Sequence, residues 1–101
     1  MEEKKIHYEF SSEKNQQLIK ERDISFEDII VALDSGGLRD TIDHPNAEKY
    51  PYQKMYVVEL NKYVYLVPFI RKDRETVFLK TIFPSRKAKK QYIMAEVSNE
   101  R

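Results

Sequence analysis

The sequence predicts a single α+β domain in which N-terminal helices pack on a small antiparallel sheet and a basic C-terminal helix follows. Three observations predict this fold. Residues 12–35 carry apolar side chains at helical spacing, residues 54–82 change to strand-rich segments joined by short turns, and residues 85–96 return to a helical pattern. A chain of 101 residues has room for one core, so residues 1–101 are assigned to one domain.

The N-terminal part predicts one strand and two helices. Residues 5–10 alternate polar and apolar side chains, as does a strand with one buried face. A first helix is expected over residues 12–20, with a serine as its N-cap. A second is expected over residues 25–35, because Ser25 and Asp28 have the spacing of a capping box. A pair of glycines is expected to end this helix.

The C-terminal part predicts a sheet and a last helix. Residues 38–54 form a connection that has room for a short strand over 38–42. Pro68 has no N–H to donate, so it is expected at a bulge or where a neighbouring strand has ended. A helix over residues 85–96, ending near Val97, closes the chain. The strand segments expected in between are joined as antiparallel hairpins by turns at Asn61-Lys62 and at residues 72–75. They are Met55–Leu60, Tyr63–Ile70 and Thr76–Ile82.

Charge is distributed unevenly along the chain, although the net charge is only +1. Residues 1–50 hold twelve acids and seven Lys or Arg, whereas residues 51–101 hold eleven Lys or Arg and five acids. Aromatic side chains lie among the cations of the second half, a combination typical of RNA-binding surfaces. The alternative is a solvated basic helix beside core aromatics. The residues expected to bind RNA are Arg71, Lys72, Arg74, Lys89 and Lys90.

Several other classes of site are not expected. His44 follows Asp43, which could orient its imidazole for acid–base chemistry, although a surface histidine in a turn has the same pattern. Neither a cluster with metal-ligand spacing nor a glycine-rich phosphate loop occurs, and there is no cysteine, so no metal and no cofactor are expected. The chain has no long apolar run or signal-like start, so a cytoplasmic protein without a membrane partner is expected.

The order of these pieces resembles the BrnT family, the toxins of a class of bacterial type II toxin–antitoxin pairs. The resemblance covers nearly the whole chain, and its most specific parts are a helix start and a closing basic helix. Where family members often carry a pair of arginines before the last helix, this chain has Ile82-Phe83. The motifs that carry the resemblance are Tyr8-Glu9-Phe10, Ile24-Ser25-Phe26-Glu27-Asp28, Asp43-His44-Pro45 and Pro84-Ser85-Arg86-Lys87-Ala88-Lys89-Lys90-Gln91-Tyr92.

The resemblance implies a compact RelE-like fold and a ribonuclease that cleaves RNA, including mRNA on the ribosome, and so inhibits translation. It also implies a cognate antitoxin, expected to be a DNA-binding protein of ribbon-helix-helix type. If cleavage occurs without a metal, Lys80 and Arg86 are expected to stabilise the charge on the phosphate. Tyr92 or His44 is then expected to act as acid or base.

Two other interpretations remain open from the sequence. The first is a non-catalytic RNA- or ribosome-binding module of the same fold that pairs with an antitoxin. The second is a structural interaction protein whose acidic N-terminal half is the working surface. RNA binding that falls with salt but leaves the RNA intact would indicate the first of these.

Overall fold

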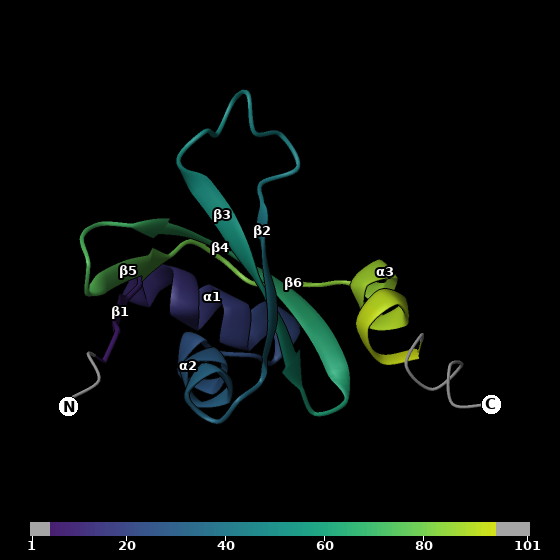
Figure 1. Ribbon diagram of the computed structural model, residues 1–101. Helices are drawn as coiled ribbons and strands as arrows, with labels where there is room; N and C mark the ends of the chain where they lie inside the picture. Colours follow the sequence, from purple (N-terminus) through teal and green to yellow (C-terminus); the bar gives the residue numbers. More distant parts are fainter. Residues whose placement is uncertain (1–4, 95–101) are drawn as a thin grey trace.

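A mixed sheet forms the centre of the computed structural model, which describes residues 5–94 (Figure 1). Its strand order is β1-β5-β4-β3-β2, and β6 pairs with β4 outside this order. With its helices the sheet makes an α+β fold, as the sequence predicted. The strands are β1 (His7–Glu9), β2 (Leu38–Asp43), β3 (Gln53–Leu60), β4 (Tyr63–Arg71), β5 (Thr76–Leu79) and β6 (Phe83–Pro84).

One pair of strands corrects the prediction of an antiparallel sheet. β1 pairs with β5 in parallel, with His7 opposite Thr76, while the other neighbouring pairs are antiparallel. The short turns in the sequence indicate hairpins only between strands that follow each other in the chain. β1 instead reaches its partner across two helices and three strands, so local spacing does not reveal the pairing.

The β3–β4 hairpin confirms two local predictions. Its turn is Asn61-Lys62, and both residues have a positive φ, 55° and 64°, as a type I′ turn requires. Pro68 lies in β4 between the end of β5 and the start of β6, where one neighbouring strand has ended. Its carbonyl accepts a hydrogen bond of 2.8 Å from the N–H of Lys80. Neither β5 nor β6 pairs with Pro68, so the sheet loses no hydrogen bond through the missing N–H of the proline.

The first face of the sheet is covered by α1 (Ser12–Arg22) and α2 (Phe26–Asp34), close to the bounds that the sequence predicts. These helices bring apolar side chains from one side of each onto alternate residues of β3, β4 and β5. The buried residues of this first core are Leu18, Ile24, Phe26, Ile29, Ala32, Tyr56, Val58, Val67, Phe69, Val77, Leu79 and Ile82.

Side-chain caps fix where α2 begins and how it meets α1. The Ser25 hydroxyl accepts the N–H of Asp28, and the Asp28 carboxylate accepts the N–H of Ser25, which confirms the predicted capping box. Buried Asn15 of α1 accepts the N–H of Phe26 at 2.7 Å and donates to the Glu27 carboxylate at 2.8 Å. The bond from Phe26 satisfies an N–H at the start of α2 that has no acceptor within the helix.

Residues 80–82 leave the sheet, which corrects the predicted strand Thr76–Ile82. The Arg22 guanidinium donates a hydrogen bond of 2.6 Å to the Ile82 carbonyl, and the Ile82 side chain is buried in the first core. The apolar pattern of this segment therefore reflects burial beside α1 rather than strand pairing.

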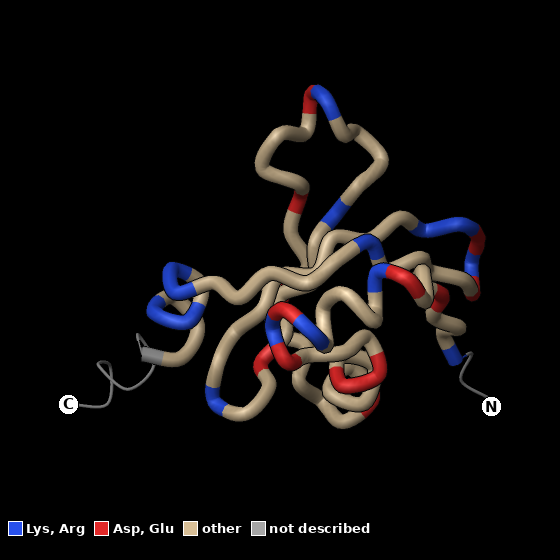
Figure 2. Tube along the Cα trace, turned by 180° about the vertical axis from the view of Figure 1, so that it is seen from behind, with Lys and Arg blue, Asp and Glu red and all other residues tan. Residues whose placement is uncertain are grey.

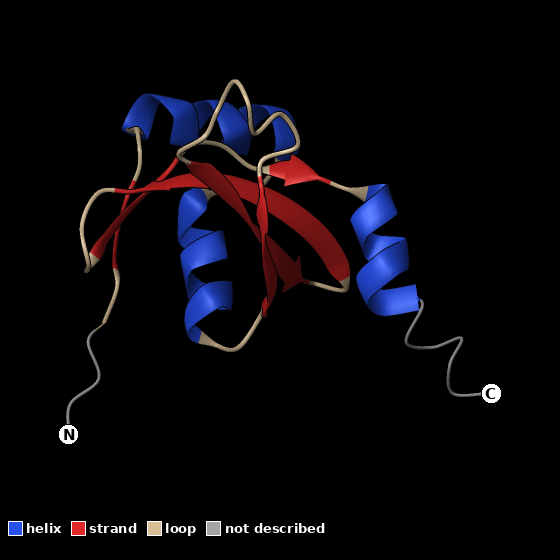
Figure 3. Cartoon of the chain, turned by 45° about the horizontal axis from the view of Figure 1, so that its top comes forward, coloured by secondary structure: helices blue, strands red, loops and turns tan. Residues whose placement is uncertain are grey.

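The opposite, second face of the sheet carries α3 (Arg86–Lys89) and a π-helical turn, η1 (Lys90–Met94). Successive residues of a strand point to opposite faces, and Val57 packs here while its neighbours Tyr56 and Val58 pack in the first core. α3 stands apart from the two N-terminal helices (Figure 3). The buried residues of this second core are Val57, Val64 and Ala88.

The start of the last helix agrees with the prediction of a helix over residues 85–96. The Ser85 hydroxyl accepts the N–H of Ala88 at 3.0 Å and so caps α3. The change to π-helical geometry at Lys90 has no sequence signal, and the predicted end near Val97 lies outside the described residues.

Candidate functional site

A hollow of about 440 Å³ opens on the first face of the sheet. Its lining residues belong to strands and to the loop before β3, and none belongs to a helix. This volume is in the range of roughly 300–1,000 Å³ that ligand pockets occupy. Its residues come from β2, β3 and β4, so rigid backbone positions most of them. We call it the Arg71 hollow; its lining residues are Thr41, Pro51, Tyr52, Lys54, Tyr56, Phe69 and Arg71.

Two stacked rings contribute the inner wall of the Arg71 hollow. The centroids of Tyr56 and Phe69 are 3.9 Å apart with an interplanar angle of 12°. Burial raises the pKa of the Tyr56 phenol, and the positive charge of Arg71 offsets part of that rise. Tyr52 differs, because its side chain is 84% exposed. Tyr56 and Phe69 are both buried, so Tyr52 is the ring in this hollow on which a nucleobase can stack.

Two cations line the same hollow, and polar contacts restrain both. The Lys54 ammonium lies 2.7 Å from the Asp43 carboxylate, and this hydrogen bond lowers the pKa of Asp43. The Arg71 guanidinium donates to the Arg74 carbonyl at 3.2 Å. Its charge also acts on Tyr8, whose pKa burial raises to about 12 while Arg71 opposes the rise. Arg71 has no ion pair among the described residues, so its charge is available to an incoming phosphate, whereas Lys54 shares its charge with Asp43.

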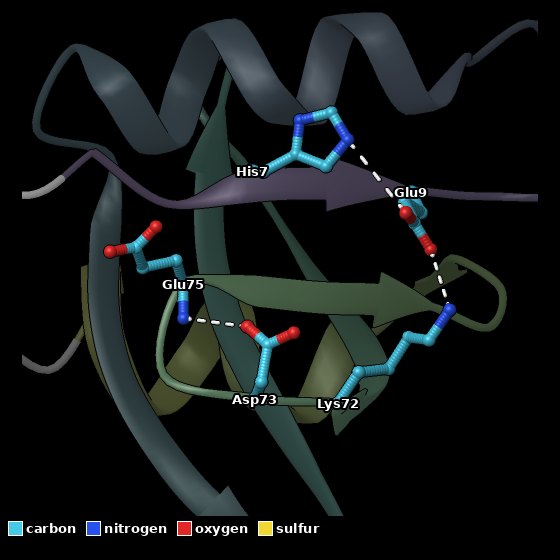
Figure 4. A network of polar contacts seen from close by, with 5 residues as sticks. All are labelled: His7, Glu9, Lys72, Asp73 and Glu75. Atoms are coloured by element: carbon cyan, nitrogen blue, oxygen red, sulfur yellow. Dashed lines mark hydrogen bonds and ion pairs between the residues drawn. The ribbon is translucent and has the colours of Figure 1, made fainter.

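Lys72, which is also expected to bind RNA, belongs to a polar network at the β4–β5 turn (Figure 4). Lys72 forms an ion pair of 2.8 Å with Glu9, and this contact raises the pKa of Lys72. Glu9 also lies 3.8 Å from the His7 imidazole. Asp73 accepts the N–H of Glu75, which lowers the Asp73 pKa. The network joins β1 to the turn, so the charge of Lys72 is matched within the fold.

The expected catalytic cations Lys80 and Arg86 lie at separate places along β4. The N–H of Lys80 bonds to Pro68, whereas the N–H of Ser85, next to Arg86, bonds to Val64. Four residues of strand separate these two anchor points, which is about 13 Å at roughly 3.3 Å per residue. The ammonium of Lys80 lies 5.7 Å from the Phe78 ring centre. The backbone anchors of the two residues are therefore separated along β4.

Tyr92, an expected acid or base, points at a carboxylate of the second face. Its hydroxyl donates a hydrogen bond of 2.8 Å to Asp40. This bond and the nearby negative charge raise the pKa of Tyr92, so its phenol keeps its proton at neutral pH. The contact fastens η1 to β2.

His44, the other expected acid or base, lies in the loop between β2 and β3. Its Nδ1 accepts the N–H of Asn46 at 3.0 Å, and its ring lies 4.6 Å from that of Tyr50. The Asp43 carboxylate bonds to Lys54 instead of to the imidazole. His44 therefore lies in a turn, and its contacts with Asn46 and Tyr50 stabilise the loop.

The sequence analysis assigned Arg71 to RNA binding but missed the residues that surround it. Lys54 and Tyr56 are two positions apart in one strand, and Phe69 and Arg71 are two apart in the next. A period of two places each pair on one face of its strand. That spacing is the signal that could have found the hollow, once the two strands were known to be neighbours.

Comparison with known proteins gave no match, either to a family model or to a curated protein. Within residues 5–94, no group of three or more His, Cys, Asp or Glu could hold a metal ion. No helix in the same range has both the length and the apolar character to cross a membrane. The Arg71 hollow and the basic α3 are therefore the features on which a functional proposal depends.

Proposed function

We propose that this protein is a BrnT-like, RelE-like toxin, a metal-independent endoribonuclease that cleaves RNA and so inhibits translation, with the Arg71 hollow as its site. One observation carries the proposal. Arg71, Lys54 and the exposed ring of Tyr52 line one hollow, whose inner wall is the buried, stacked pair of Tyr56 and Phe69. Cations for phosphate beside rings for bases are the components of RNA recognition.

RNA supplies its own nucleophile, so such a site needs few groups. The 2′-oxygen attacks the neighbouring phosphorus, its proton passes to water, and the bond to the 5′-oxygen breaks. The 5′-oxygen takes up a proton, leaving a 2′,3′-cyclic phosphate and a 5′-hydroxyl. Arg71 and Lys54 would stabilise the charge that builds on the phosphate, and Tyr56, which holds its proton at neutral pH, would donate to the 5′-oxygen.

A second candidate function is RNA binding without cleavage. The seven lining residues of the hollow include no carboxylate and no imidazole, the groups that most often take a proton in catalysis. The Asp43 carboxylate, which bonds to the lining residue Lys54, has a lowered pKa, a property of a weak base. A binding module would use the same cations and rings but leave the RNA intact.

Cleavage of cellular RNA in EDTA, with and without ribosomes, distinguishes the two functions. The wild-type protein is expected to cleave, and Arg71→Gln is expected to cleave about a hundredfold or more slowly, because a charge used in the transition state is lost. Lys72→Gln is the matched control, since it removes one positive charge from the adjacent residue, which pairs with Glu9. Its activity is expected to stay within about threefold of the wild type, because an exposed ion pair contributes little.

Three results would contradict parts of the proposal. Intact RNA in every reaction, together with affinity for RNA that falls with salt, would favour the binding module. Full activity in Arg71→Gln would remove the site from the hollow. If Arg86→Gln or Lys80→Ala alone abolished cleavage, the site would lie nearer the last helix, as the sequence analysis expected.

The proposal includes a cognate antitoxin, which the resemblance implies. The fold has partly exposed apolar side chains that a partner could cover, of which Val31 is 63% exposed and Leu38 is 41% exposed. Expression of the chain alone is expected to arrest growth, and co-expression with its neighbouring gene is expected to relieve the arrest and yield a complex. Recovery of only the uncomplexed chain after co-expression would contradict this part.

A further inference from the structure

The last helix carries a concentration of positive charge that the fold does not use. α3 and η1 present four cations within five residues, Arg86, Lys87, Lys89 and Lys90, and neither element contains an acid. Figure 2 shows Lys and Arg on this helix with no Asp or Glu among them. Like charges three and four residues apart repel one another on a helix, so this arrangement is unfavourable by itself.

Three other cations each form an ion pair inside the fold. Arg39 pairs with Glu59 at 2.7 Å, Lys54 with Asp43 and Lys72 with Glu9. For the cations of α3 and η1, the described part of the chain provides no ion pair; Lys89 lies instead 4.9 Å from the Tyr63 ring centre. An anionic partner from outside these residues would relieve the repulsion that the helix carries.

The second core holds this helix so that its cations face outward. Ala88 is buried against the sheet, Ser85 caps the first turn, and Tyr92 bonds to Asp40. The side chains left exposed include Arg86, Lys87 and Lys90. The exposed side chains of residues 86–93 are Arg86, Lys87, Lys90 and Gln91, whereas Tyr92 is half-buried and bonded to Asp40, so this surface suits phosphates better than nucleobases.

The helix and the Arg71 hollow lie on opposite faces and near opposite ends of β4. Tyr56 and Phe69 of the hollow belong to the first core, whereas Ala88 of α3 packs on the second face. Lys89 contacts Tyr63 at the start of β4, and Arg71 ends the strand. Eight residues of strand span about 26 Å at roughly 3.3 Å per residue, too far for one nucleotide to contact both.

We propose that α3 and η1 form a second RNA-binding surface, which holds the phosphate backbone of base-paired RNA while the Arg71 hollow takes an unpaired segment. This rests on the proposed function only in that RNA is the ligand class. Base-paired RNA is the occupant that the observations favour, because its bases are already stacked and its phosphates are exposed. The surface would position the protein on structured RNA without reading its sequence.

Binding of a labelled RNA hairpin stem of about 16 base pairs tests the proposal, with fluorescence anisotropy measured over a series of salt concentrations. The variant Arg86→Gln/Lys87→Gln/Lys90→Gln is expected to bind the stem at least tenfold more weakly. The slope of log K against log salt is expected to fall by about two to three, because each phosphate contact contributes about 0.9. The matched control Lys14→Gln/Lys20→Gln/Lys49→Gln removes the same charge from other parts of the surface and is expected to keep both values near wild type.

Further measurements separate this surface from the hollow. Arg71→Gln is expected to bind the stem as tightly as the wild type, and the α3 triple variant is expected to bind a short unpaired oligonucleotide within about threefold of the wild type. Stem binding that survives when no form of the protein cleaves RNA would still support the inference while contradicting the ribonuclease proposal.

The inference is overturned if the control and α3 variants lose stem binding equally, which would show a general charge effect. It is also overturned if the wild type does not bind the stem at 0.1 M salt. Loss of affinity for phosphatidylserine vesicles, rather than for RNA, in the α3 variant would assign the helix to a lipid surface and equally overturn it.

Discussion

The two faces of the sheet differ in how much of the fold they carry. The first face holds a core of twelve buried residues under two helices, one of which has a full capping box. The second face holds a core cluster of three buried residues under a helix that is α-helical for four residues and then π-helical for five. Burial of apolar surface is the main stabilising contribution in folding, so the first face determines stability. The second face can therefore present repelling cations at small cost to the fold.

A substitution in the first core should have the largest effect. Phe26 is fully buried and stacks on Phe10, with their ring centroids 4.9 Å apart. Phe26→Ala is expected to lower the free energy of unfolding by about 3–5 kcal/mol, because it leaves a cavity under α2. Urea denaturation followed by circular dichroism measures this loss. Val31→Ala on the exposed side of the same helix is the control, and an equal loss in both variants would contradict the assignment of the core.

The bond that joins the two N-terminal helices should have an intermediate effect. Asn15→Ala would leave the buried N–H of Phe26 without its acceptor, and the Glu27 carboxylate would lose a donor. The expected decrease in the free energy of unfolding is about 1–3 kcal/mol. Gln17→Ala, two residues along α1 on an exposed position, serves as comparison in the same denaturation experiment. A change below about 0.5 kcal/mol for Asn15→Ala would show that water replaces the bond without loss.

A substitution on the second face should have the smallest effect on the global free energy of unfolding. Its effect should be confined to the last helix. Tyr92→Phe removes the hydrogen bond to Asp40 and is expected to lower the global free energy of unfolding by less than about 1 kcal/mol. Amide hydrogen exchange should nevertheless become faster in residues 86–94 while α1 and α2 stay protected. Uniform acceleration over all helices would contradict the difference between the faces.

Local signals in the sequence predicted local structure well. The capping box at Ser25, the turn at Asn61-Lys62 and the position of Pro68 each depend on the chemistry of a few neighbouring residues. The parallel pairing of β1 depends instead on residues far apart in the chain, for which spacing carries no signal. The π-helical turn and the packing of α3 on the second face are likewise decided by contacts with distant strands.

The candidate site was predicted only in part, for a related reason. Clusters of charge along the chain pointed to residues 71–90, because charge density is visible in one dimension. Arg71 of that segment lies in the hollow, but Lys54 and Tyr56 join it only through the pairing of β3 with β4. Lys80 and Arg86 are close in sequence, yet their strand anchors are separated, so proximity along the chain was a poor guide to proximity in space.

The parallel pairing of β1 with β5 also determines how much of the chain must be synthesised before the sheet can be completed. His7 lies opposite Thr76, a separation of 69 residues (76 − 7). β1 can find its place only after the residues up to β5 have been made, and such long-range pairing slows folding. Arg71 is made five residues before Thr76, since 76 − 71 is 5, so the last residue of the hollow and the strand that completes the sheet emerge almost together. A nascent chain therefore cannot complete this sheet before residues 76–79 have been made.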